Sequence, residues 1–226
     1  MSEIQIRFDN GAAYEDYMGK WSQLAGERFI DWLAPAGGAR WLDVGCGNGA
    51  FTEMLVARCA PSSVHGVDPS AEQLQFARQR PALAAAQLQT GDAMALPFAA
   101  ASFDIAVMPL VIFFVPEPAK GVAEMRRVLA PGGLFLCLEF SRPRAWLRPF
   151  YDLYSFFVIP RLGAAVAREP AAYQYLVESI RRFPDQRGFA RLMREQGLAR
   201  VEWRNLSFGI AALHSGRKPE SHGSRR

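Results

Sequence analysis

The sequence predicts an α/β protein built on a mainly parallel sheet with helices on both faces. Strand-like and helix-like segments alternate from residue 25 to about residue 140, as expected for successive β-α units. Residues 41–49, WLDVGCGNG, have the form of a buried strand that leads into a glycine loop and a helix. Residues 103–108 form a nearly continuous apolar run, which is typical of a strand covered on both faces.

The individual elements follow from apolar runs bounded by prolines, glycines and capping residues. Ser70 is a plausible N-cap, and Glu72 in the following turn suits the helix dipole. The expected parallel strands are 40–44, 64–67, 86–90, 103–108 and 134–140, and the expected helices are 24–33, 50–59, 70–80, 118–129 and 188–197. Residues 201–206 and 210–214 predict a terminal antiparallel pair, which brings the sheet to seven strands.

Residues 141–185 break this alternation. They are rich in tyrosine, phenylalanine and proline, and we interpret them as a helical insertion after the fifth strand rather than as a second domain. The chain is therefore expected to form a single domain over residues 1–216. Residues 217–226 predict a short, basic and disordered tail.

Composition excludes several classes of protein. The net charge of +4 falls largely on the tail, so no basic face for nucleic acid is expected. The three cysteines lack pairing or metal-ligand spacing, which predicts reduced thiols and no metal site. No signal peptide is visible, and the longest apolar run, 105–115, is too short to span a membrane. We expect a cytoplasmic protein that could still touch a membrane surface.

Three glycines and three aspartates point to a nucleotide-like cofactor. The glycines Gly45, Gly47 and Gly49 form a loop that the cofactor backbone can approach closely. Asp43, Asp68 and Asp92 each fall at or just after the end of an expected parallel strand, where such sheets bind ligands. There they could accept hydrogen bonds from an ammonium group, from ribose hydroxyls and from an adenine amino group, respectively. This set fits S-adenosylmethionine (SAM).

Two other interpretations of the same residues stay open. Residues 45–50 also satisfy the dinucleotide fingerprint, although no Tyr-x-x-x-Lys pair for hydride transfer follows. Alternatively, the aspartates and glycines could simply be turn and capping residues. Against both, the segments LPF at 96–98, SFD at 102–104 and RVLAPGG at 127–133 come in order. With these, residues 37–140 resemble a class I SAM-dependent methyltransferase, with the Rossmann-like fold of that group.

The C-terminal third narrows the resemblance. LEFSRP at 138–143, YDLYSF at 151–156, YQYLVESIRRFP at 173–184 and GIAALHSGRK at 209–218 resemble the ubiquinone/menaquinone biosynthesis C-methyltransferase family. The resemblance implies methylation of a ring carbon of a polyprenylated benzoquinol or naphthoquinol. It also implies cofactor contacts at Asn48, Asp68, Asp92, Ala93 and Pro109.

The chain departs from this family at one place. An Arg-Asn pair that the family carries after the fourth strand is replaced by Phe113 and Phe114. Candidates for the base that activates the quinol are therefore Glu139, Glu178 and His214. Each has an ordinary structural alternative, as a cap, a helix-surface ion pair or a buried strand residue.

The aromatic residues of the insertion suggest how an apolar substrate is bound. We expect Phe113, Phe114, Tyr151, Tyr154 and Tyr175 to line an apolar pocket for a prenylated quinol, while also serving as core. One alternative is another small aromatic or lipid substrate, and another is a catalytically weak SAM-binding subunit of a quinone-biosynthesis assembly. A homodimer and peripheral membrane contact are further expectations.

Overall fold

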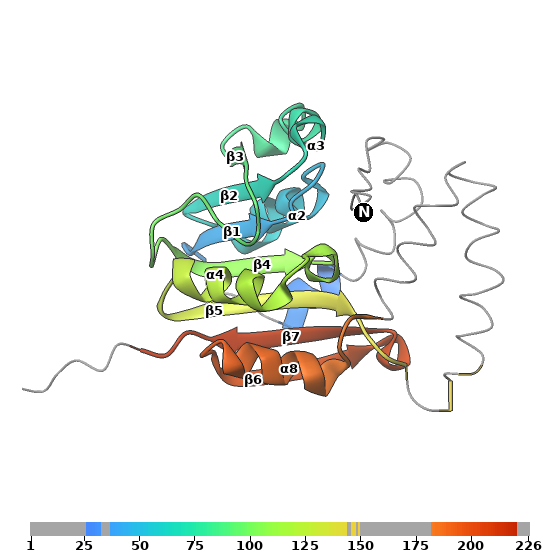
Figure 1. Ribbon diagram of the computed structural model, residues 1–226. Coiled ribbons are helices and arrows are strands. Elements are labelled where there is room, and N and C mark those ends of the chain that lie inside the picture. The colour runs from blue at the N-terminus through green and yellow to red at the C-terminus, as the bar shows by residue number, and fades with distance from the viewer. Residues whose placement is uncertain (1–25, 33–36, 144–145, 148, 150–181, 221–226) are drawn as a thin grey trace, which may run out of the picture.

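The computed structural model describes residues 26–32, 37–143, 146–147, 149 and 182–220 (Figure 1). Seven strands form one sheet in the order β3-β2-β1-β4-β5-β7-β6. The strands are β1 (Arg40–Val44), β2 (Ser63–Asp68), β3 (Gln87–Thr90), β4 (Phe103–Pro109), β5 (Leu129–Phe140), β6 (Ala199–Leu206) and β7 (Ala211–Arg217). The α-helices are α2 (Ala50–Cys59), α3 (Ala71–Ala77), α4 (Pro118–Val128) and α8 (Gln186–Glu195), and residues 26–32 are also helical.

The sheet has the predicted mixed topology. The pairs β1–β2, β2–β3, β1–β4 and β4–β5 are parallel, whereas β7 runs antiparallel to both β5 and β6. Strand order reverses between β1 and β4, so the connections leaving these two strands diverge. Such a switch point is where doubly wound sheets bind ligands, at the carboxyl ends of the strands. In Figure 1 the arrowheads of β1, β2, β4 and β5 all lie on this edge.

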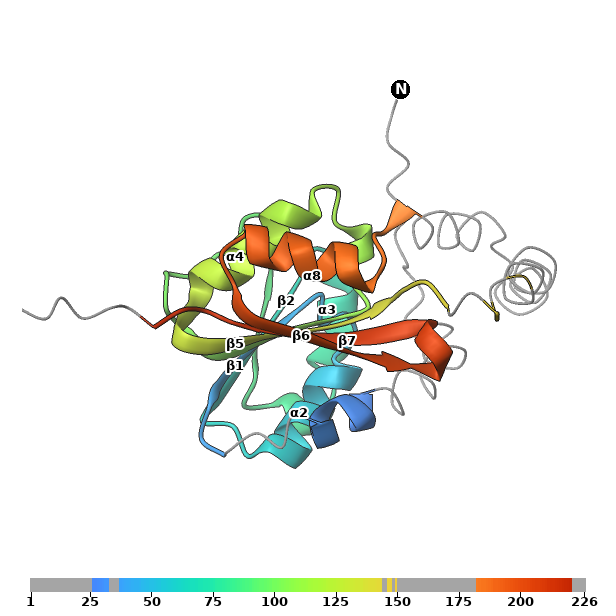
Figure 2. The same cartoon turned by 90° about the horizontal axis from the view of Figure 1, so that it is seen from below.

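Helices cover both faces of the sheet, which explains the apolar strands. Figure 2 shows α4 and α8 on one face, and α2 with the helical residues 26–32 on the other. The largest fully buried side chains include Trp41 of β1, Phe135 of β5 and Phe189 of α8. Residues at the strand ends, rather than in this core, are therefore available for function.

Sequence patterns predicted most element starts to within a few residues. The hydroxyl of Ser70 accepts the Gln73 N–H at the start of α3, which confirms the predicted cap. Helix α8 begins earlier than expected, because the Asp185 side chain caps it by accepting the Gly188 N–H at 2.8 Å. No helix in the described ranges is long and apolar enough to cross a membrane.

Two boundaries differ from the prediction: the start of β5 and the start of the C-terminal tail. Strand β5 begins at Leu129 rather than at 134, because Leu129 pairs with Phe103. The tail was expected to be disordered from residue 217, which is wrong for its first residues. Arg217 ends β7, and the Lys218 backbone N–H donates to the Gly133 carbonyl of β5 at 2.9 Å, so the strand pairing extends further. The Lys218 ammonium also donates to the Leu129 carbonyl at 2.6 Å. Of the aromatic insertion, residues 150–181 lie outside the described residues.

Candidate functional site

The glycine loop joins β1 to α2 and packs closely on its neighbours. A Cβ at Gly45 would lie 2.3 Å from Val111 Cγ2, and a Cβ at Gly49 would lie 2.5 Å from Leu83 Cδ1. Both glycines also have positive φ, 75° and 80°, which side chains rarely tolerate. A Cβ at Gly47, by contrast, would meet nothing within 4 Å. The two outer glycines therefore pack against the protein, whereas the middle glycine has open space beside it. A loop that binds a cofactor needs both features.

Asp68 holds this loop against the end of β2. Its Oδ2 accepts the Gly47 N–H at 2.9 Å, and its Oδ1 accepts the Ser70 N–H at 2.9 Å. Burial raises the pKa of the Asp68 carboxyl, while these two backbone donors lower it. Each carboxylate oxygen has a second lone pair, so Asp68 can still accept bonds from a ribose diol.

Asp43 is a fully buried residue beside the glycine loop, and only one of its two carboxylate oxygens has a hydrogen-bond partner among the described residues. Its Oδ2 accepts the hydroxyl of Thr52 at 2.7 Å, and both residues are 0 % exposed. Its Oδ1 is also buried, and no described residue hydrogen-bonds to it. Burial, with a smaller contribution from the charge of Asp68, raises the pKa of Asp43 to about 7, and the Thr52 bond opposes this rise. A cationic ligand group at Oδ1 would complete the site, which fits the ammonium of SAM.

Asp92 begins the loop that follows β3. Its Oδ1 accepts the Met94 N–H at 2.8 Å, and its carbonyl accepts the Ala95 N–H at 3.0 Å. This turn therefore uses one carboxylate oxygen and leaves the side chain exposed. The neighbouring Ala93 packs against the hydrophobic core.

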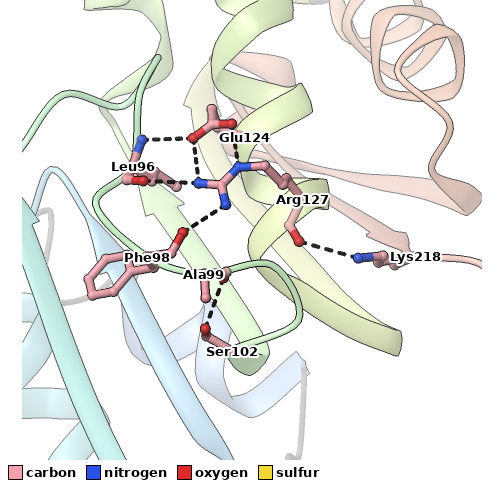
Figure 3. A network of polar contacts seen from close by, with 7 residues as sticks. All are labelled: Leu96, Phe98, Ala99, Ser102, Glu124, Arg127 and Lys218. Atoms are coloured by element: carbon pink, nitrogen blue, oxygen red, sulfur yellow. Dashed lines mark hydrogen bonds and ion pairs between the residues drawn. The ribbon is translucent and has the colours of Figure 1, made fainter.

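Arg127 anchors the same loop to α4 (Figure 3). Its guanidinium donates to the Phe98 carbonyl at 2.7 Å and to the Leu96 carbonyl at 2.9 Å. It also pairs with Glu124 at 2.6 Å, and Glu124 accepts the Leu96 N–H at 2.7 Å. These contacts explain why the LPF and RVL segments occur together: they fix the loop that presents Asp92.

Sequence reasoning missed two residues that support the cofactor loop. Thr52 was missed although its signal was present, since helical spacing places it on the buried stripe of α2 with Leu55 and Cys59. Arg80 donates its Nε–H to the Asn48 carbonyl at 2.7 Å and pairs with Glu53 at 2.7 Å. A lone arginine after a helix gives no pattern from which this contact could be predicted.

Asn48 and Cys46 act within the loop itself. The Asn48 side chain is 7 % exposed, and its Oδ1 accepts the Ala50 N–H at 3.2 Å at the start of α2. Burial raises the pKa of the Cys46 thiol well above its ordinary value, with further contributions from the charges of Asp43 and Asp68. This thiol is a poor nucleophile, in agreement with its interpretation as a packing residue.

A short turn after β4 lies between the glycine loop and β5. Pro109 ends β4, Leu110 takes a positive φ of 58°, and Ile112–Phe114 form the 3-10 helix η2. The Phe113 and Phe114 rings pack at 3.9 Å between centroids. Phe113 also meets Phe140 at 5.8 Å, at the end of β5. The two replaced positions thus form an apolar pair at the carboxyl edge of the sheet.

Glu139 is buried directly against this turn. It is 0 % exposed, and its Oε1 accepts the Phe140 N–H at 2.7 Å. Its Oε2 is buried and has no partner among the described residues. Burial raises the pKa of Glu139 well above its ordinary value, and the backbone donors only partly oppose that rise.

The structure places His214 away from this group. It sits opposite Cys137 in the middle of β7, and its ring contacts Phe189 of α8 at 4.9 Å. Its Nε2 lies 3.2 Å from the Gln186 carbonyl, and burial lowers its pKa to about 4. The other predicted residues, Glu178, Tyr151, Tyr154 and Tyr175, lie outside the described residues. Among those that are described, no cluster of His, Cys, Asp and Glu could hold a metal ion.

Comparison with known proteins decides the family. Residues 20–218 match the model of the ubiE/COQ5 methyltransferase family. The chain belongs to this family. It is 48 % identical over 189 residues to the Ubiquinone/menaquinone biosynthesis C-methyltransferase UbiE of Rubrivivax gelatinosus, covering 84 % of this chain and 74 % of that protein. It is 42 % identical over 225 residues to UbiE of Dinoroseobacter shibae, covering 95 % and 90 %.

Solved structures agree on the fold. A SAM-dependent methyltransferase from Thermotoga maritima aligns with a TM-score of 0.63 at 22 % identity, covering 91 % of this chain and 98 % of that one. Phosphoethanolamine N-methyltransferase 2 of Haemonchus contortus, in complex with S-adenosyl-L-methionine, aligns with a TM-score of 0.69 at 17 % identity, covering 92 % and 56 %. The Rossmann-like fold and the family resemblance are confirmed, and the chain is a SAM-dependent methyltransferase. The assignment of individual site residues stays a prediction.

Proposed function

We propose that this protein transfers a methyl group from SAM to a ring carbon of a demethylated quinol precursor in ubiquinone/menaquinone biosynthesis. The observation that carries the proposal is the extent of similarity to the UbiE relatives, 42 to 49 % identity over most of the chain. The site geometry is consistent with it, because the carboxylates Asp43, Asp68 and Asp92 all lie at or just after the carboxyl ends of parallel strands, at one edge of the sheet.

The glycine loop and its carboxylates are proposed to hold SAM. Asp43 Oδ1 would accept the ammonium group, Asp68 the ribose hydroxyls, and Asp92 with Ala93 the adenine. Asn48 and Pro109 would flank the cofactor from the loop and from the end of β4. SAM, when bound, supplies an electrophilic methyl group on a sulfonium. The protein contributes orientation, and holding two reacting atoms in line can lower a barrier by several kcal/mol, up to about 7–11 kcal/mol.

The apolar turn is proposed to face the quinol ring. A phenol-like hydroxyl has a pKa of about 10, so carbon methylation requires its deprotonation. Of the two candidate bases that the structure describes, only Glu139 lies next to Phe140, whose ring packs on Phe113. His214 contacts α8 instead, and its low pKa favours a neutral ring that donates to the Gln186 carbonyl. We therefore assign His214 a structural role in this proposal, and Glu178 stays a candidate.

Peripheral contact with a membrane is a second part of the proposal. Trp146 and Phe208 are 59 % and 60 % exposed, and their rings pack at 5.7 Å between centroids. An exposed aromatic pair of this kind suits the headgroup region of a bilayer, where a prenylated substrate would reside. Homodimer formation, or assembly with other quinone-biosynthesis proteins, is the remaining proposed partnership.

Mass spectrometry with methyl-deuterated SAM tests the function. The purified protein would be mixed with reduced demethylated benzoquinol or naphthoquinol, with Asp43→Asn as the matched variant. A deuterated methyl on the ring carbon, lost in the variant, is the expected result and names the ring. SAM binding without transfer to either quinol would favour another aromatic or lipid substrate, or a catalytically weak subunit.

A further inference from the structure

Arg80, which follows α3, reaches the glycine loop through two contacts. Pro81 comes next in the chain and disfavours helical backbone at Arg80, which has the extended angles φ −75° and ψ 118°. The Arg80 Nε–H donates to the Asn48 carbonyl at 2.7 Å, and its Nη1 pairs with Glu53 in the first turn of α2 at 2.7 Å. The Arg80 side chain is only 17 % exposed, so these contacts are partly shielded from water and salt.

The segment that carries Arg80 also packs directly against the loop. A Cβ at Gly49 would lie 2.5 Å from Leu83 Cδ1 and 3.1 Å from Ala77 Cβ. These two residues flank Arg80 along the chain, one at the end of α3 and the other in the 3-10 helix η1 (Pro81–Leu83). Because Gly49 has no side chain, this segment can approach the loop closely enough for Arg80 to bond to its backbone.

The peptide unit between Asn48 and Gly49 is held at both ends. Its N–H, on Gly49, donates to the Cys46 carbonyl at 2.9 Å, and its carbonyl, on Asn48, accepts from Arg80. The preceding unit, between Gly47 and Asn48, differs, because no described residue hydrogen-bonds to its carbonyl or to its N–H. A Cβ at Gly47 would also meet nothing within 4 Å. This unit is therefore the part of the loop whose backbone is available to a ligand.

We infer that Arg80 is a positioning residue for SAM: it fixes the Asn48–Gly49 peptide and thereby keeps the Gly47–Asn48 peptide facing the cofactor. The two peptide units are planar and share the Cα of Asn48, so only the φ and ψ angles of Asn48 set their relative orientation. Without the Arg80 bond the loop is less preorganised, and ordering it reduces the affinity for the cofactor. The inference rests on the proposed cofactor site and does not depend on the proposed quinol.

The place of the unbonded peptide indicates which part of SAM it serves. It lies just before α2, and the N-terminus of a helix favours negative groups. The same loop follows Asp43, the proposed partner of the ammonium group. The Asn48 N–H is therefore suited to the carboxylate of the amino-acid portion of SAM. S-adenosylhomocysteine carries this portion, whereas methylthioadenosine lacks it, so the two ligands together distinguish an effect on this peptide from a general distortion of the site.

Arg80→Met and Arg78→Met form a matched pair of variants. Arg78 ends α3 two residues before Arg80, and its guanidinium donates to the Leu88 carbonyl of β3 at 2.8 Å rather than to the loop. Both variants therefore remove one positive charge and one bond to a backbone carbonyl from the same segment. Urea unfolding without ligand checks that the two proteins are folded and of similar stability. Arg80→Gln, which keeps a polar side chain, repeats the test if R80M does not fold.

Isothermal titration of the two ligands decides the inference. We expect R80M to bind S-adenosylhomocysteine about tenfold more weakly than wild type, because the bond from a charged donor is lost. R78M should stay within about twofold, and methylthioadenosine should bind R80M within about threefold of its wild-type affinity. Unchanged binding of S-adenosylhomocysteine in R80M, or an equal loss for both ligands, would overturn the inference. If wild type binds S-adenosylhomocysteine but methylates no quinol, the quinol proposal fails while the titrations still decide the role of Arg80.

Discussion

The hydrogen bond between Thr52 and Asp43 should control how SAM affinity depends on pH. Replacing Thr52 by valine keeps the shape of the side chain and removes the hydroxyl that donates to Asp43 Oδ2 at 2.7 Å. A bond to a charged group contributes about 1.5–3 kcal/mol, and one pKa unit corresponds to about 1.4 kcal/mol. The pKa of Asp43, about 7 in the wild type, should therefore rise to between about 8 and about 9 in T52V.

The consequence for binding follows from the ionised fraction of Asp43. At pH 7 this fraction falls from about one half to between about 1 % and 10 %, so SAM should bind about 5- to 50-fold more weakly. Above about pH 9.5 the difference should shrink to about twofold, because Asp43 is then mostly ionised in both proteins. Asp68 faces Asp43 as a like charge and Cys46 as a neutral thiol, and neither is altered by the substitution.

Isothermal titration of SAM between pH 6 and pH 9.5 measures this effect. Thr52→Ser is the control, since it retains the hydroxyl and should restore the wild-type pH dependence. Titrations in buffers of different ionisation enthalpy should also show release of about half a proton on binding to the wild type near pH 7. A constant loss of affinity at every pH in T52V would refute the reasoning, because it would indicate a packing defect.

Three further predictions follow from the same site. First, the folded-state pKa of Asp43 lies near 7 and its ordinary value is 3.8, so the folded protein holds a proton that the unfolded chain releases between these values. Stability without SAM should therefore fall as pH rises through this window, by up to about 4 kcal/mol, and Asp43→Asn should flatten the curve of urea midpoint against pH. Second, Gly45→Ala should weaken SAM binding by at least about tenfold, and adding Val111→Ala should recover part of this loss in titration, since the clash is with that side chain. Third, Arg127→Gln should lower the free energy of unfolding by about 1–2 kcal/mol in urea titration, because the loop carbonyls lose their donor; an unchanged midpoint would contradict the anchor.

The fold and the cofactor edge could be predicted because they depend on local patterns. A glycine loop after an apolar strand, with Asp68 at the next strand end, defines β1, α2 and β2 without reference to the rest of the chain. The supporting contacts of Arg80 and Lys218 could not be predicted in this way. Arg80 reaches the Asn48 carbonyl across 32 positions, and Lys218 reaches the Leu129 carbonyl across 89. Side chains that bond to distant backbone carry no spacing signal.

The turn that carries Phe113 and Phe114 can change its side chains without changing its backbone position. The turn after β4 is held by the Leu110 N–H, which donates to the Leu138 carbonyl at 2.7 Å, and by Val111, which packs close to Gly45. Neither anchor uses the side chain of Phe113 or Phe114. These two positions can therefore differ from the polar pair expected from the family resemblance while the turn keeps its place beside the cofactor loop. The apolar pair should thus affect which ring is accepted and how it is deprotonated, whereas the position of the turn depends on its backbone bond to β5.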